Sequence, residues 1–151
     1  MPGLWRLYRA KYGPGLDGIG GTFADGRWHN RGDRVVYFGA SAAIAVLERL
    51  AHTDADLLPD DLRLARFNYP DAVPLLNVEA LSALPAGWVQ DEAATRCIAR
   101  PWWRERSSCL LMVPSAILPE ETNVLFNPQH PDAVTLQLVE ERPFQFDSRL
   151  L

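Results

Sequence analysis

The stretch that decides the fold runs from Gly26 to His52 and reads GRWHNRGDRVVYFGASAAIAVLERLAH. A polar turn leads into a β-branched and aromatic run at Val35–Phe38, which predicts a buried strand. The segment Ser41–His52 has no internal glycine or proline and begins with a serine, a residue favoured at helix N-caps, so it predicts a helix. Apolar residues lie around nearly its whole circumference, and we expect this helix to be mostly buried. The stretch therefore predicts a strand–turn–helix unit.

The segments on either side of this unit predict more strands than helices. Alternating or apolar runs bounded by prolines and glycines predict strands at Leu4–Arg9, Leu62–Tyr69, Val73–Val78, Ser108–Val113, Asn123–Phe126 and Val134–Glu140. Asp91–Arg106 predicts a helix, or two short helices separated at Pro101. Because strands and helices do not alternate regularly, the pattern favours an α+β fold with a mixed or antiparallel sheet. No repeat or long linker divides the chain, which predicts one compact domain over residues 1–151.

Composition excludes several classes of protein. The 151 residues are 48% hydrophobic and 23% charged, as in an ordinary globular domain. A net charge of −4 argues against a nucleic-acid binder, which needs a basic face. No apolar run approaches the roughly 20 residues of a membrane span, and no signal peptide is visible, so we expect a cytoplasmic protein. The histidines lie on separate predicted elements without partners at ligand spacing, so we expect no metal site.

Glu48 is the residue that fits its surroundings least. A carboxylate within a nearly all-apolar helix is costly unless it is paired or functional. It either forms a buried salt bridge, for example with Arg27, or faces a pocket, and His52 lies four residues on along the same helix face. Tyr37 is either a core aromatic or a stacking platform for a flat ligand. Together, Arg27, Tyr37 and Glu48 suggest a guanidinium, an aromatic face and a carboxylate around one cleft.

The same stretch, 26–52, resembles the core motif of the RES domain family. LPAGW at 84–88 resembles the middle of the family pattern, and LLMVPSAILPEETNVLFNPQHP at 110–131 resembles its later blocks. The resemblance covers nearly the whole chain, with the motifs in the expected order. It implies a fold similar to the ADP-ribosyltransferase toxins. It also implies the toxin of a bacterial toxin–antitoxin pair, neutralised by an Xre-like antitoxin with a helix-turn-helix region.

The resemblance further implies that NAD+ is the substrate, broken at the nicotinamide-bearing ribose carbon. ADP-ribose then passes to a protein acceptor, or to water or phosphate. The functional positions of the motif fall on Arg27, Tyr37, Glu48 and His52, its later polar positions on Ser115 and Asn127, and the basic NAD-binding position of related folds on Arg6 or Arg9.

The physical chemistry is consistent with these roles. A carboxylate such as Glu48 stabilises the oxocarbenium character that develops on the ribose. A guanidinium such as Arg27 fits a pyrophosphate bidentately, and Tyr37 can stack on the nicotinamide ring. His52 can hydrogen-bond a ribose hydroxyl or position Glu48.

Two further expectations follow. We expect the antitoxin to cover the mouth of the cleft, where an acidic segment would pair with arginines such as Arg27 and Arg31. The alternative to an enzyme is a small non-enzymatic α+β interaction module whose polar cluster is structural. The two interpretations differ in whether Arg27, Tyr37, Glu48 and His52 converge on one cleft.

Overall fold

The computed structural model describes residues 3–151, so the first two residues of the predicted domain lie outside the described part. One seven-stranded sheet has the strand order β4-β5-β6-β2-β1-β3-β7. Its strands are β1 Leu4–Arg9, β2 Val36–Gly39, β3 Leu62–Asn68, β4 Leu75–Asn77, β5 Leu110–Pro114, β6 Thr122–Phe126 and β7 Gln137–Pro143. The α-helices are α1 Ala42–Ala51 and α2 Glu92–Glu105, and the 3-10 helices are η1 Ile19–Thr22, η2 Ala55–Leu57, η3 Val78–Ala80, η4 Trp88–Gln90, η5 Pro131–Thr135 and η6 Ser148–Leu150. Since β4 pairs with β5 in parallel and the other pairs are antiparallel, the predicted α+β fold with a mixed sheet is confirmed.

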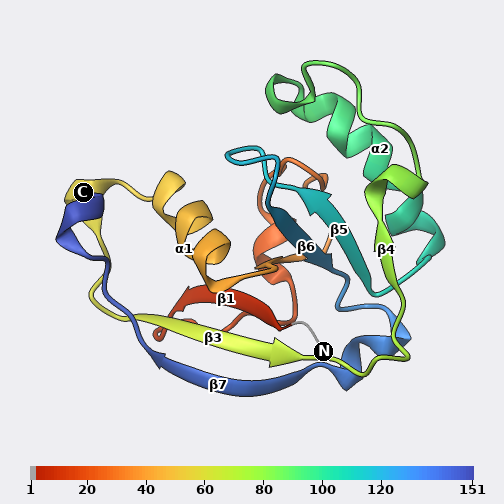
Figure 1. Ribbon diagram of the computed structural model, residues 1–151. Helices are drawn as coiled ribbons and strands as arrows, with labels where there is room; N and C mark the ends of the chain where they lie inside the picture. The colour runs from red at the N-terminus through yellow and green to blue at the C-terminus, as the bar shows by residue number, and fades with distance from the viewer. Residues whose placement is uncertain (1–2) are drawn as a thin grey trace.

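The sheet splays between β1 and β2. Every residue of β1 has a partner in β3, and every residue of β2 has one in β6. In contrast, the register between β1 and β2 contains the single pair Trp5 and Gly39. Figure 1 shows the β1–β3–β7 half running along the bottom and the half that contains β6, β5 and β4 standing to the right of it. At the junction of the two halves, some backbone N–H and C=O groups therefore have no partner in the neighbouring strand and are available to side chains.

Helix α1 is anchored at this junction. The hydroxyl of Ser41 accepts a hydrogen bond from the Ile44 amide at 3.2 Å, which confirms the predicted N-cap. Gly39 allows the helix to come close to β2, because a Cβ at this position would lie 2.7 Å from both the Ala45 nitrogen and Ile44 Cγ2. The prediction that α1 is mostly buried is wrong: only Ile44 and Ala45 are buried. The strands cover one side of the helix, and apolar periodicity alone does not reveal how many elements cover it.

Helix α2 runs unbroken through Pro101, so the expected interruption does not occur. Its buried stripe of Thr95, Ala99 and Trp102 packs on the β5–β6 half of the sheet and holds the helix together. Pro101 and Cys97, the residue whose carbonyl loses its helical donor, are both exposed. Water can solvate that carbonyl, which reduces the usual cost of a proline in a helix.

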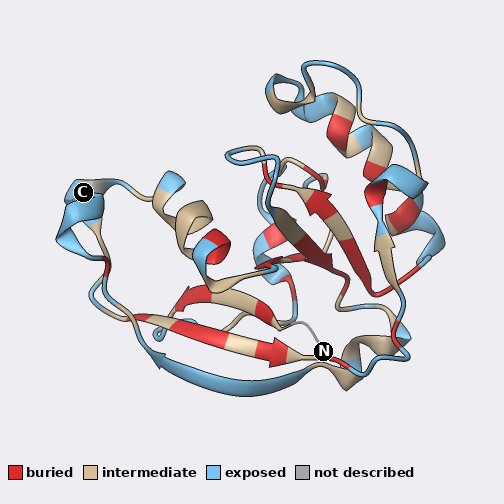
Figure 2. Ribbon diagram, viewed as in Figure 1, coloured by how far each residue is buried: buried red, intermediate tan, exposed pale blue. Residues whose placement is uncertain are grey.

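The last strand begins later than predicted. The segment Pro131–Thr135 forms the 3-10 helix η5 instead, and His130 caps it by accepting a hydrogen bond from the Asp132 amide at 3.0 Å. Strand β7 follows as the outer edge of the sheet, exposed along its length, beside the largely buried β3 (Figure 2). None of the helices within residues 3–151 is long and apolar enough to cross a membrane.

Candidate active site

Glu48 lies on α1 with its carboxylate directed at the loop between β5 and β6. Its Oε1 accepts hydrogen bonds from the Ser115 hydroxyl and the Asn123 amide, each at 2.8 Å. The Ser115 hydroxyl also accepts from the amides of Ile117 at 3.1 Å and Leu118 at 3.2 Å. One donated and two accepted bonds saturate a hydroxyl. The fully buried Ser115 thereby fixes the position of the half-buried Glu48 carboxylate relative to the backbone of the β5–β6 loop.

Asn123 is a site residue that sequence reasoning did not identify. It lies near the start of β6, opposite Gly39 of β2, and its side chain reaches a helix 75 residues earlier in the chain. The one local signal is an amide side chain at the edge of the apolar run VLF, and such residues are also common at strand ends for turn formation.

Tyr37 faces the same side of the sheet as Asn123. The register pairs Tyr37 with Leu125 and Gly39 with Asn123, and side chains alternate along a strand, so these positions share one face. The phenol oxygen of Tyr37 lies 2.6 Å from His29 Nδ1 and accepts from the Trp28 amide at 3.4 Å. Burial raises the pKa of Tyr37 well above its ordinary value, so the phenol is neutral at physiological pH.

Arg27 does not pair with Glu48, and the hypothesis of a salt bridge between them is wrong. Its Nη1 donates to the Val89 carbonyl at 2.8 Å, and its Nη2 lies 3.6 Å from a carboxylate oxygen of Glu92. Val89 belongs to η4, just before α2, and Glu92 is the first residue of α2. Arg27 is nevertheless near Tyr37, since the amide of the next residue, Trp28, donates to the Tyr37 hydroxyl. Burial raises the pKa of that phenol, and the positive charge of Arg27 opposes this effect.

His52 lies at the end of α1 and is exposed. Its Nδ1 is 2.7 Å from the backbone carbonyl oxygen of Glu48, so the ring caps the helix and does not contact the Glu48 carboxylate. In the described structure Arg27 and Tyr37 therefore form one group and Glu48 another on the same side of the sheet, while His52 stands apart from both.

Arg6 occupies the splayed junction between β1 and β2. Its Nε donates to the Pro14 carbonyl at 2.7 Å and its Nη1 to the Tyr37 carbonyl at 3.0 Å. Burial, together with the positive charge of Arg49, lowers the pKa of Arg6 to about 10, which leaves the guanidinium charged at neutral pH. No carboxylate pairs with Arg6 among residues 3–151. Arg9, by contrast, forms an ion pair with Asp61 at 2.8 Å.

Asn127 lies away from the Glu48 group, just beyond the far end of β6. Its Oδ1 accepts from the Gln129 amide at 3.0 Å, and its backbone amide donates to the Cys109 carbonyl at 2.9 Å. It lies four positions after Asn123 along the chain, a span of about 13 Å in a strand. The contacts of Asn127 are those of a turn residue.

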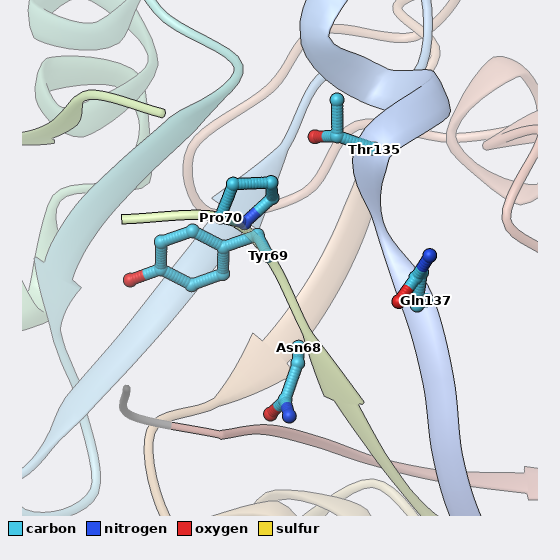
Figure 3. A pocket seen from close by; sticks show the side chains of 5 residues that line it. All are labelled: Asn68, Tyr69, Pro70, Thr135 and Gln137. Atoms are coloured by element: carbon cyan, nitrogen blue, oxygen red, sulfur yellow. The ribbon is translucent and has the colours of Figure 1, made fainter. Parts of the chain in front are cut away.

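Two hollows on the described surface are lined by residues other than the predicted site residues. One of about 730 Å³ is lined by Glu79, Ala83, Leu84, Pro85, Ala86, Gly87, Trp88, Pro114 and Pro119, so it lies beside the loop that carries Ser115. The other, of about 370 Å³, lies between the end of β3 and the start of β7 and is lined by Asn68, Tyr69, Pro70, Thr135 and Gln137 (Figure 3). Within the described residues no group of three or more His, Cys, Asp or Glu side chains is placed to hold a metal ion.

Comparison with known proteins identifies the family. Residues 3–147 match the family model of the RES domain. The chain is 41% identical over 149 residues to the Pseudomonas putida protein called Toxin Res, covering 97% of this chain and 98% of that protein. It is 35% identical over 155 residues to a Sphingobium sp. protein called Prs ADP-ribosylating toxin, covering 98% and 96%.

A solved structure shares the fold. One chain of the Mycobacterium tuberculosis MbcT–MbcA toxin–antitoxin complex superposes with a TM-score of 0.71 at 21% identity, covering 94% of this chain and 83% of that one. The family match over residues 3–147 and the end-to-end similarity to Toxin Res show that the chain belongs to the RES domain family.

Proposed function

We propose that this chain is a toxin that consumes NAD+. It breaks the bond between nicotinamide and C1′ of the ribose, and it passes ADP-ribose to a protein acceptor, or to water or phosphate. The observation that carries this proposal is the hydrogen bonding of the Glu48 carboxylate. Two neutral donors, Ser115 and Asn123, bind one carboxylate oxygen, and no cationic side chain among the described residues neutralises the charge. A carboxylate held in this way is available for positive charge that forms during a reaction.

The chemistry follows from that charge. When the C1′–nitrogen bond breaks, its electron pair leaves with nicotinamide and the ribose gains oxocarbenium character. The second oxygen of Glu48, Oε2, is the group that would face this cation. An acceptor then attacks C1′ with a lone pair and loses its proton. The neutral phenol of Tyr37, on the same side of the sheet, offers an aromatic face for the nicotinamide ring.

Two arginines near α1 that form no ion pair within the described residues support an anionic substrate, although the charge of Asp61 acts on one of them, Arg49. Arg6 has no acidic partner among the described residues, and the Arg49 Nε is buried without a hydrogen-bond partner there. Burial is the main cause that lowers the pKa of both groups. A partly buried guanidinium with unmet hydrogen-bonding capacity is costly, and a pyrophosphate would add negative charge beside both arginines through charge-assisted hydrogen bonds. We therefore assign the phosphates of NAD+ to Arg6 and Arg49, and a lesser role to Arg9, which Asp61 already neutralises.

His52 and Asn127 keep supporting roles in this proposal. The exposed ring of His52 lies at the end of α1, where a ribose hydroxyl could reach it. Asn127 shapes the turn after β6. Arg27 serves mainly to hold the segment that carries Trp28 and His29 against α2, since its own guanidinium is engaged by Val89 and Glu92.

A partner antitoxin completes the proposal, since a protein of similar fold is known in complex with one. We infer an Xre-like antitoxin that covers the face carrying Glu48 and Tyr37. Arg31 is exposed, and an acidic segment of the partner would pair with it. The charge of Arg27 is already satisfied within the chain, which leaves Arg31 as the stronger contact of the two.

The test is incubation of the purified protein with NAD+, followed by mass analysis of small molecules and proteins. One arm contains no added protein, and a second contains Prs, which the Sphingobium ADP-ribosylating toxin carries in its name. We expect nicotinamide release in both arms or in the second alone, and an ADP-ribose adduct on the acceptor if transfer occurs. A third arm contains a whole-cell extract as a source of other acceptors. Absence of nicotinamide release in all three arms would refute NAD+ consumption.

A further inference from the structure

His29 is a buried side chain, 6% exposed, to which the proposed reaction has so far given no role. Both of its ring nitrogens have partners: Nε2 lies 3.0 Å from the Ala24 carbonyl oxygen, and Nδ1 lies 2.6 Å from the Tyr37 hydroxyl. A carbonyl oxygen can only accept, so Nε2 carries the proton of the neutral ring. Nδ1 is then an acceptor, and the Tyr37 hydroxyl donates to it. The two contacts together define one tautomer.

The segment that carries His29 is held rigidly by α2. Three successive carbonyls, those of Gly26, Arg27 and Trp28, accept hydrogen bonds from side chains of α2, namely Arg96, Thr95 and Trp103 in that order. The carbonyl of His29 itself accepts from the Gly26 amide at 3.0 Å. Each backbone acceptor from 26 to 29 is therefore occupied, and the imidazole has a well-defined position.

Gly26 shows how closely this cluster is packed. A Cβ at this position would lie 2.4 Å from His29 Nδ1 and 2.8 Å from the Tyr37 hydroxyl. These distances leave no room for any side chain beside the bond between His29 and Tyr37. The hydrogen bond between His29 and Tyr37 thus requires a glycine at position 26. Helix α2 holds the segment that carries His29, and β2 carries Tyr37.

We propose that His29 is a positioning residue that holds the ring of Tyr37 in place for the nicotinamide of NAD+, and that it does so only while its imidazole is neutral. This inference rests on the proposed function. If Nδ1 takes up a proton it becomes a donor, the bond to Tyr37 reverses, and the phenol O–H is left without an acceptor among its contacts in the described residues. This unsatisfied donor favours rotation of the phenol away from the position that the neutral imidazole holds, and NAD+ cleavage slows.

The charged groups around the pair set the direction of the pH effect. Burial lowers the pKa of His29 below its ordinary value, while the charges of Asp33 and Asp25 oppose that effect. The charges that act on the Tyr37 phenol are those of Glu92, Arg27 and Arg96. Because the pKa of His29 is lowered, the ring is neutral at pH 7, and the loss of activity falls below about pH 6.5.

The experiment measures kcat/KM for NAD+ cleavage between pH 5 and 8 in wild type, His29→Asn and His29→Leu. The leucine variant has no acceptor, and losing one hydrogen bond of about 1.4 kcal/mol lowers the rate about tenfold at pH 7. Asparagine offers an acceptor near the position of Nδ1 that does not titrate. We expect it to recover most of that loss and to flatten the fall in rate at acidic pH.

A second pair of variants separates positioning from general destabilisation. In a Tyr37→Phe background the hydroxyl is absent, so His29→Leu should cause no further loss of rate, although it lowers Tm in both backgrounds. An equal loss in both backgrounds, or an unchanged acid limb in His29→Asn, overturns the role of His29 while leaving NAD+ consumption intact. A wild-type protein that cleaves no NAD+ overturns the proposed function and this role with it.

Discussion

Replacing Glu48 by glutamine removes the charge of the proposed catalytic carboxylate while keeping its shape. The glutamine oxygen can still accept from Ser115 and Asn123, so the helix and the loop keep their contact. What is lost is attraction between a carboxylate and a developing oxocarbenium ion. At a separation of about 4 Å and an effective dielectric constant of about 20, that attraction is about 4 kcal/mol. A loss of this size corresponds to about a thousandfold in rate.

The assay is the initial rate of nicotinamide release, measured together with the thermal unfolding midpoint. Glu120→Gln is the matched control, because Glu120 is an exposed carboxylate in the same β5–β6 loop as Ser115. We expect the control to keep the wild-type rate and Glu48→Gln to lose it, with a similar Tm for both. A Glu48→Gln protein that is folded and cleaves NAD+ within tenfold of wild type would contradict the electrostatic reasoning.

Three further outcomes are expected. Gly26→Ala should lower the free energy of unfolding in urea by about 1–3 kcal/mol through overpacking, whereas Gly20→Ala, with no atom within 4 Å of the added Cβ, should change it little. The hydrogen bond from Arg9 lowers the pKa of Asp61. The ion pair between them therefore stabilises the fold at pH values above the ordinary aspartate pKa of about 3.9, and this stabilisation is lost as the pH falls through the pKa of Asp61 in the folded protein. Asp61→Asn should therefore be less stable than wild type at pH 7, and the difference should vanish in acid, as followed by urea unfolding at each pH. Arg31→Glu should weaken the complex with the cognate antitoxin more than Arg142→Glu on the far edge strand β7, measured as Kd; equal effects would place the antitoxin elsewhere.

Local patterns predicted those parts of the fold that local interactions determine. The alternation of LWRLYR located β1 at its observed bounds, and Ser41 marked the start of α1 because a cap acts within three residues. The predicted break of the helix at Pro101 was wrong because it, too, was based on local sequence alone. A proline signals a break through its own backbone, but the buried stripe of α2 and the solvent beside Cys97 decide whether the helix continues.

Within the candidate site, the sequence predicted those residues whose chemistry is unusual for their local surroundings. Glu48 stood out because an acid in an apolar helix needs an explanation. Its partner Asn123 gave no such signal, since the hydrogen bond joins residues 75 positions apart. The ion pair of Arg27 with Glu92 likewise depends on where α2 packs against the sheet. Pairings of this kind follow from topology, which composition and spacing do not contain.

The position of Glu48 explains why an acid is tolerated on α1. That helix packs against β1, β2 and β6, so it bridges the junction at which the two halves of the sheet share the single register pair of Trp5 and Gly39. The hydrogen bonds from Ser115 and Asn123 to Glu48 are a polar tie across the same junction. The contacts that aim the carboxylate therefore also hold the halves together. Removing either donor will reduce stability and NAD+ cleavage together, whereas Glu48→Gln, which keeps the acceptor and loses the charge, separates the two effects.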